Sequence, residues 1–291
     1  MSIQIISTVL VAASTYDLTD LRTAKDELSI NPADTSPDAF ISRAITQVSA
    51  AVANYCNRTF QLETVQDVCI YDRDAYPFQV PGGGDPLQLS RYPMTSAYVT
   101  LATSGAVASG AVLNFAATAG VFVGQPVAGT NIPIGAVVSA VGASSVTISV
   151  AVAGTVAAGA AITFGTLVVV ANSASSLAGL VQDTDYRIDG RRGQLVRCNA
   201  YTGYPLTWNS VPTTVIYQGG YATIPADITD VVLRAVTQRF SGRGRDPFLK
   251  HQTQPGIGEQ SYWIGGTPGS SGAFTRELAD QLDNYRVPVT A

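Results

Sequence analysis

The chain has 291 residues, of which 46% are hydrophobic and 13% are charged, with a net charge of −4. This length allows one large domain or two modest ones, and the hydrophobic content is enough for a core. Cys56, Cys69 and Cys198 show neither the spacing nor the even number of a zinc site or a disulfide framework. We interpret them as buried free thiols.

The N-terminal segment, residues 1–14, is apolar but has no Lys or Arg before Arg22. We interpret it as an ordered extension or strand and not as a secretory signal. No stretch is long and continuous enough to span a bilayer. We therefore expect a soluble protein, made inside the cell, with no membrane partner.

Amphipathic periodicity predicts four helices, and the second has the clearest pattern. Its apolar residues recur at the i, i+1, i+4, i+5 spacing of one helical face, after Ser36 as a cap and Pro37 in the first helical position. Asp17 or Thr19 is the expected cap of the first helix. The predicted helices cover residues 19–28, 38–56, 225–240 and 274–285.

Alternating apolar residues predict strands on either side of these helices. The expected strands lie near residues 64–71, 87–89, 167–171, 186–189, 193–197 and 213–217. The predicted fold class is α+β. In this prediction a helical bundle with antiparallel strands forms a body from residues 1–102 and 166–291.

The remaining block, residues 103–165, belongs to a stretch between Arg91 and Asp183 that has no Asp, Glu, Lys or Arg. Regular glycines and short alternating runs predict a small all-β insert here. Its low charge has two explanations that the sequence leaves open. The exposed positions are either Thr, Ser and Asn on a solvated sandwich, or a surface that packs against neighbouring copies.

Residues with catalytic or ligand-binding chemistry do not gather into a recognisable motif. His251 is the only histidine, and no serine or cysteine in a recognisable nucleophile motif accompanies it. The loop 81–85 lacks the Lys-Ser/Thr and the helix of a phosphate-binding loop. The acids at 72–74 and 183–189 do not complete a calcium loop. We expect no catalytic, cofactor or metal site, and therefore no enzyme.

A basic group of residues marks the end of the third helix and the loop after it: Arg234, Arg239, Arg243, Arg245 and Lys250. One interpretation is a solvated helix end favoured by the helix dipole. The other is contact with DNA phosphates or with an acidic protein surface. Because aromatic residues are not interleaved here, a protein surface is favoured. The Gly/Pro-rich residues 242–272 are too long for a simple connector.

Several stretches resemble the tailed-phage head-tail connector (HK97 gp6-like adaptor) family, over about residues 15–100 and 180–245. The first half matches with a Lys-x-x-Leu helix and a long helix that ends in a Tyr, an Arg and an aromatic residue. The second half matches with a strand, a Gly-Tyr pair and a helix that begins with Pro. The matching residues are 18–28, 38–60, 186–193, Trp208, 215–221 and 224–228.

This resemblance implies a structural protein of the virion neck, made in the host cytoplasm. Such adaptors form a ring, generally a dodecamer, below the portal, and DNA passes through its lumen without sequence-specific binding. The implied partners are the portal protein, neighbouring copies and the next stopper or tail protein. We expect portal contacts from Arg239, Arg243, Arg245, Lys250 and Trp263.

Two other classes of function stay open at this stage. One is another neck or tail protein, such as a stopper or a tail-tube completion protein, in which the insert directs assembly. The other is a carbohydrate-binding or adhesive module. The insert has only Phe115, Phe122 and Phe164 as aromatic residues, and this weakens the sugar-binding alternative.

Overall fold

The structure is a computed structural model that describes residues 3–71, 86–94, 98–170, 180–208, 212–243, 251–254, 258–261 and 274–287. The chain divides into two compact units. The sheet unit comprises Met1–Ala13 and Leu62–Tyr221, and the helical unit comprises Ser14–Gln61 and Ala222–Ala291. Each unit therefore combines segments that are distant in the sequence.

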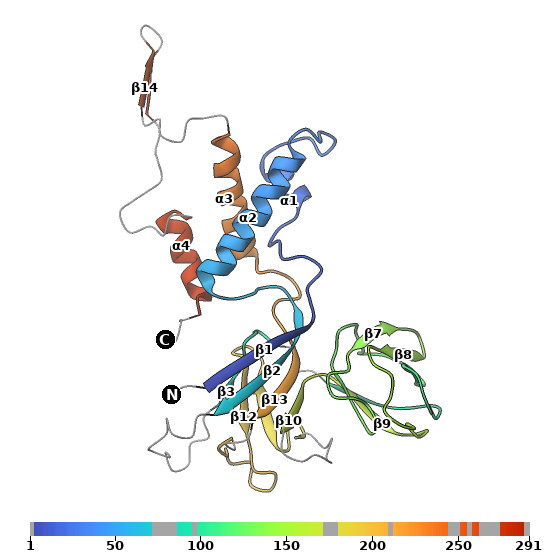
Figure 1. The fold of residues 1–291 in the computed structure, drawn as a ribbon. Helices are drawn as coiled ribbons and strands as arrows, with labels where there is room; N and C mark the ends of the chain where they lie inside the picture. Colours follow the sequence, from blue (N-terminus) through green and yellow to red (C-terminus); the bar gives the residue numbers. More distant parts are fainter. Residues whose placement is uncertain are drawn as a thin grey trace. The chain divides into compact units, whose positions relative to one another are not determined.

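The main sheet of the sheet unit has the strand order β1-β2-β13-β10, and every neighbouring pair is antiparallel (Figure 1). Val65 of β2 pairs with Val9 on one side and Tyr217 on the other. Val65 and Tyr217 point into the core, as the period of two along a strand requires. The strands are β1 (Ile3–Val11), β2 (Glu63–Tyr71), β10 (Leu167–Val170) and β13 (Thr213–Gly219).

A second antiparallel sheet, in the order β11-β12-β3, contributes to the same core. Leu87, Tyr186 and Leu195 from this sheet are buried in one cluster with Val65 and Tyr217 of the main sheet. The two sheets thus share one apolar interior. The strands are β3 (Leu87–Gln88), β11 (Tyr186–Asp189) and β12 (Gln194–Arg197).

The insert, together with β4 directly before it, forms two further three-stranded antiparallel sheets, β4-β9-β6 and β5-β8-β7. Their core contains Leu113, Phe115, Val146, Ile162 and Phe164, and every member of this cluster comes from the insert. The predicted division at residues 103–165 stays a prediction, because this packing does not measure independent folding. The strands are β4 (Val99–Ala102), β5 (Val112–Asn114), β6 (Val127–Ala128), β7 (Val138–Val141), β8 (Ser145–Ile148) and β9 (Ala161–Phe164).

The helical unit packs α2 and α3 through their apolar faces, with α1 and α4 against them. The cap of α1 is Asp20, whose Oδ1 accepts a hydrogen bond from Thr23 N at 2.8 Å, and not the expected Asp17 or Thr19. Ser36 does not cap α2, which follows Pro37 without a side-chain cap. The elements are α1 (Leu21–Glu27), α2 (Asp38–Cys56), α3 (Ala226–Ser241), β14 (His251–Gln254), β15 (Gly258–Ser261), α4 (Arg276–Leu282) and the 3₁₀ turn η2 (Asp283–Tyr285).

The predicted fold class, a helical bundle body with accessory strands, is wrong. Within the described residues the chain has fifteen strands and four α-helices, and it is mostly β. The strands form sheets with an apolar core of their own, whereas the helices form a separate unit. The periodicity of α2 is a strong local signal, but the pairing of β2 with β13 joins segments about 150 residues apart and leaves no local trace.

The predicted buried free thiols are confirmed, since Cys56, Cys69 and Cys198 are all buried and unpaired as disulfides. Among the described helices, none combines the length and the apolar character that crossing a bilayer requires.

Candidate functional site

The predicted partner residues divide between described and undescribed parts of the chain. Arg239 lies in the last turn of α3, and Arg243 follows the end of that helix. Both are exposed. Arg245, Lys250 and Trp263 lie outside the described residues.

The structure holds the two described arginines against α2. Arg239 Nη1 donates a hydrogen bond to Gln47 Oε1 at 3.0 Å. The guanidinium carbon of Arg243 lies 5.2 Å from the centre of the Phe40 ring, and that of Arg43 lies 5.8 Å from the same centre. We call Arg43, Arg239 and Arg243 the arginine cluster.

Sequence reasoning missed Arg43, because it lies almost 200 residues before Arg239. The i, i+3 spacing of Phe40 and Arg43 on a helix was the available signal, since such residues are neighbours on the helix surface. Phe240 of α3 contacts Phe40 edge-on, with ring centres 6.1 Å apart. This aromatic pair brings the end of α3 to the start of α2.

The arginine cluster has no salt bridge to a carboxylate in the part of the chain that the structure describes. Arg234, one turn earlier on α3, differs, because its guanidinium is bound by Asp230 at 2.9 Å and by Glu277 at 3.1 Å. The C-terminal end of α3 also favours positive charge nearby. The cluster can therefore offer several guanidinium N–H groups to carboxylates or phosphates of another molecule.

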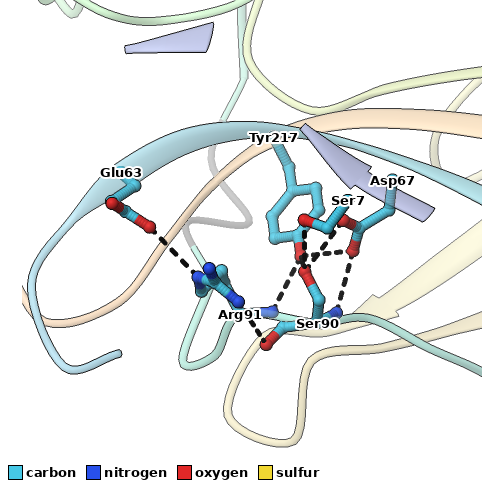
Figure 2. A network of polar contacts seen from close by, with 6 residues as sticks. All are labelled: Ser7, Glu63, Asp67, Ser90, Arg91 and Tyr217. Carbon is cyan, nitrogen blue, oxygen red and sulfur yellow. Dashed lines mark hydrogen bonds and ion pairs between the residues drawn. The ribbon is translucent and has the colours of Figure 1, made fainter. Parts of the chain in front are cut away.

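A buried polar network in the sheet unit is another place where charged groups meet (Figure 2). Asp67 of β2 is fully buried and accepts three hydrogen bonds. Ser90 N and Ser90 Oγ each donate to it at 2.8 Å, and Tyr217 Oη donates at 2.7 Å. Ser7 of β1 contacts Ser90 Oγ at 3.1 Å.

The network continues to an ion pair between the partly buried Arg91 and the buried Glu63. Arg91 N donates to Tyr217 Oη at 2.9 Å, and Arg91 Nε donates to Glu63 Oε2 at 3.1 Å. Glu63 is almost fully buried, and a buried carboxylate requires such partners. These bonds attach the segment after β3 to β2 and β13.

The network's chemistry favours a structural role. Burial, followed by the charge of Asp67, raises the pKa of Tyr217, so its phenol stays protonated and donates to the carboxylate. The sequence did contain a signal for this network, an acid at an inward-facing position of a strand. Asp67 lies two residues from both Val65 and Cys69, which face the core, so all three are on the same face of β2.

Two of the acids considered as metal ligands, Asp185 and Asp189, have structural partners. Asp185 Oδ2 accepts a hydrogen bond from Val181 N at 2.9 Å, and Asp189 lies 3.9 Å from Arg192 Nε. The described residues contain no group of three or more His, Cys, Asp or Glu side chains suited to a metal ion. The acids at 72–74 and the loop 81–85 lie outside the described residues.

Comparisons with known proteins give only remote likenesses. No family model and no curated protein matches the chain. Two similar solved structures are the neck of an empty gene transfer agent particle with C6 symmetry (11% identity, TM-score 0.37) and the virion of a native gene transfer agent particle (10% identity, TM-score 0.42). Each likeness covers 98% of this chain and 97% of the other. At these scores the likeness is too loose to assign a function.

Proposed function

We propose that this chain is a structural protein in the neck of a phage-like virion, and more finely a head-tail connector that forms a ring below the portal. The observation that carries the proposal is that parts of the two separated stretches resembling that family, residues 15–61 and 222–243, meet in the helical unit. Leu18 N donates to Ser49 Oγ of α2 at 3.0 Å, and Thr229 Oγ1 of α3 donates to Leu18 O at 3.4 Å. Residues from both stretches thus share one buried junction.

The arginine cluster is the surface that we assign to the portal. Its guanidinium groups have no carboxylate partner among the described residues, while the whole chain has a net charge of −4. An acidic surface on the portal would supply the missing partners. Exposed charge pairs are screened by salt, so this contact should weaken as ionic strength rises.

We also infer that the chain acts without catalysis. Among the described residues the strongly perturbed groups are Tyr217, Tyr186, Cys69 and Cys56, and all have a raised pKa with burial as the main cause. A raised pKa keeps these acids protonated and therefore poor nucleophiles. An upward pKa shift caused by burial is expected of residues in a protein core.

The test is binding to DNA-filled heads that carry portals but lack neck proteins, with portal-free shells as the parallel sample. Co-sedimentation measures the binding, and electron microscopy shows its place on the particle. We expect a ring below the portal and no binding to portal-free shells. Equal binding to both samples would contradict the connector assignment.

A charge-matched pair of variants tests the surface. Replacing Arg43, Arg239 and Arg243 by Ala should reduce head binding at least tenfold. The control replaces Arg187, Arg191 and Arg192, which are exposed on the sheet unit, by Ala. Both variants lose three positive charges, so equal losses would mean that net charge and not the cluster governs binding.

A stopper or tail-completion protein is the second candidate, because strands dominate the described chain. It predicts binding to heads that already carry a connector, or to tails, and no binding to bare portals. The head-binding experiment separates the two proposals.

A further inference from the structure

A charge-free cleft lies in the sheet unit between the insert and the strands beside it. Its volume is about 240 Å³, and none of its lining residues is charged. The insert contributes Ile132 and Ile134, and the strands contribute Leu167 and Ile216. The lining also includes the polar side chains of Thr100, Thr163, Thr166 and Gln182, so the cleft is uncharged but mixed in polarity. Its apolar part gains free energy when an apolar side chain replaces water there.

Three of the residues that line the cleft are exposed large hydrophobic side chains: Tyr98, Ile134 and Val181. Single exposed apolar residues are normal on a protein surface, but a group of them around one opening indicates an interaction site.

The same insert presents an apolar tip. Phe122 is 65% exposed and Val123 is 57% exposed. Neither residue lines the cleft of its own chain. The insert thus exposes two adjacent large apolar side chains at one turn.

This tip is held in shape by hydrogen bonds from the insert and from β2. Phe122 N donates to Oε1 of the buried Gln125 at 2.8 Å. Gly124 has φ +87°, and its N donates to Val138 O at 2.8 Å. Thr64 Oγ1 donates to the carbonyl of Gly124. A turn fixed in this way loses little conformational entropy when it binds.

We propose that the Phe122–Val123 tip of one copy inserts into the cleft of a neighbouring copy. Both halves of the contact are uncharged and occur on the same chain, so a second copy is the occupant that the surface fits. A tip in a cleft is a heterologous contact, and such contacts close into a ring when the rotation allows it. This inference deepens the proposed function: that the copies form a ring rests on the proposed connector role, and the inference adds the contact between neighbouring copies.

The experiment uses sedimentation velocity on the purified full chain and two complementary variants. The tip variant carries Phe122→Ser and Val123→Ser, and the cleft variant carries Ile134→Glu and Val181→Glu. All four side chains are exposed, so both variants should fold. The control carries Val112→Ser and Val150→Ser, which are exposed on the insert outside the cleft.

The wild-type chain and the control should form concentration-dependent oligomers, and each contact variant alone should stay monomeric. A mixture of the two contact variants should form a one-to-one heterodimer and nothing larger, because only one intact tip and one intact cleft can meet. Such a dimer would establish the head-to-tail contact.

The inference is overturned by a wild-type chain that is monomeric at every concentration up to its solubility limit. A tip variant that still forms oligomers, a control that does not, or a mixture that stays monomeric would overturn it too. Because this measurement uses no heads or portals, its failure is distinguishable from a failure of the connector assignment.

Discussion

The insert and the main sheet belong to the same unit but satisfy their buried polar groups differently. The main sheet buries two carboxylates, Glu63 and Asp67, and surrounds them with charged and hydroxyl donors. The insert has no charged residue, and short side chains bind its backbone. Thr103 Oγ1 donates to Ala157 O, and Asn131 Nδ2 donates to Thr155 O, both at 2.7 Å.

This difference shows that a charge-free block can still satisfy its polar groups. In the insert, stability should depend on how well apolar side chains fill the core. In the main sheet, it should depend on complete hydrogen bonding around a buried charge. The predictions below test this distinction, from the largest expected effect to the smallest.

Phe164→Ala should have the largest effect, because it removes a fully buried ring from the insert core. Phe164 contacts Phe115 edge-on, with ring centres 5.7 Å apart. Truncation of such a residue costs about 3–5 kcal/mol of unfolding free energy. Urea unfolding followed by circular dichroism measures it. The matched control is Val150→Ala, at an exposed position of the insert outside the cleft, where we expect a change within about 0.5 kcal/mol.

Asp67→Asn should be next, because an amide cannot accept all the hydrogen bonds that the carboxylate accepts. The variant removes the buried charge and leaves one of its buried donors unpaired, and this lowers the unfolding free energy by about 2–3 kcal/mol. The same urea titration measures the loss. Asp183→Asn is the control, since Asp183 is exposed and has φ +65°, which Asn tolerates. Equal losses in the two variants would contradict the importance of the network.

Tyr217→Phe should have a smaller effect. It removes one donor to Asp67 and the acceptor of Arg91 N but keeps the ring in the core. We expect a loss of about 1–2 kcal/mol. Tyr201→Phe on a fully exposed side chain is the control and should be neutral. A neutral Tyr217→Phe would mean that the hydroxyl contributes nothing net.

The reactivity of Cys69 tests most directly whether the core of the main sheet opens independently of the core of the insert. Burial raises the pKa of Cys69 to about 12, so at pH 8 this thiol stays protonated and reacts slowly in the folded chain. Since the folded pKa exceeds the ordinary value of 9.0, Cys69 lowers stability as pH rises above about 9.

Mass spectrometry of the Cys69 peptide after alkylation at pH 8 measures local opening of the main sheet. We expect Asp67→Asn to accelerate the modification severalfold and Phe164→Ala to leave it nearly unchanged. Faster modification of Cys69 in Phe164→Ala would show that the two cores open together and that the comparison does not hold.

Local patterns in the sequence carried much of the secondary structure. The apolar spacing of residues 38–56 and of 225–240 corresponds to α2 and α3 within a residue or two. The alternation at 64–71 and 213–217 corresponds to β2 and β13. These signals are available because helix and strand periodicities repeat within a few residues.

The sequence by itself thus determined where α2, α3, β2 and β13 lie and which block has no charge, whereas it placed neither the single strands of the insert nor β14 and β15. Only the tertiary structure decided that β2 pairs with β13, that Arg43 joins Arg239 and Arg243, and that Asp67 meets Tyr217. These contacts join residues about 150 to 200 positions apart. Their existence depends on the collective packing of whole sheets and helices, which no short window of sequence encodes.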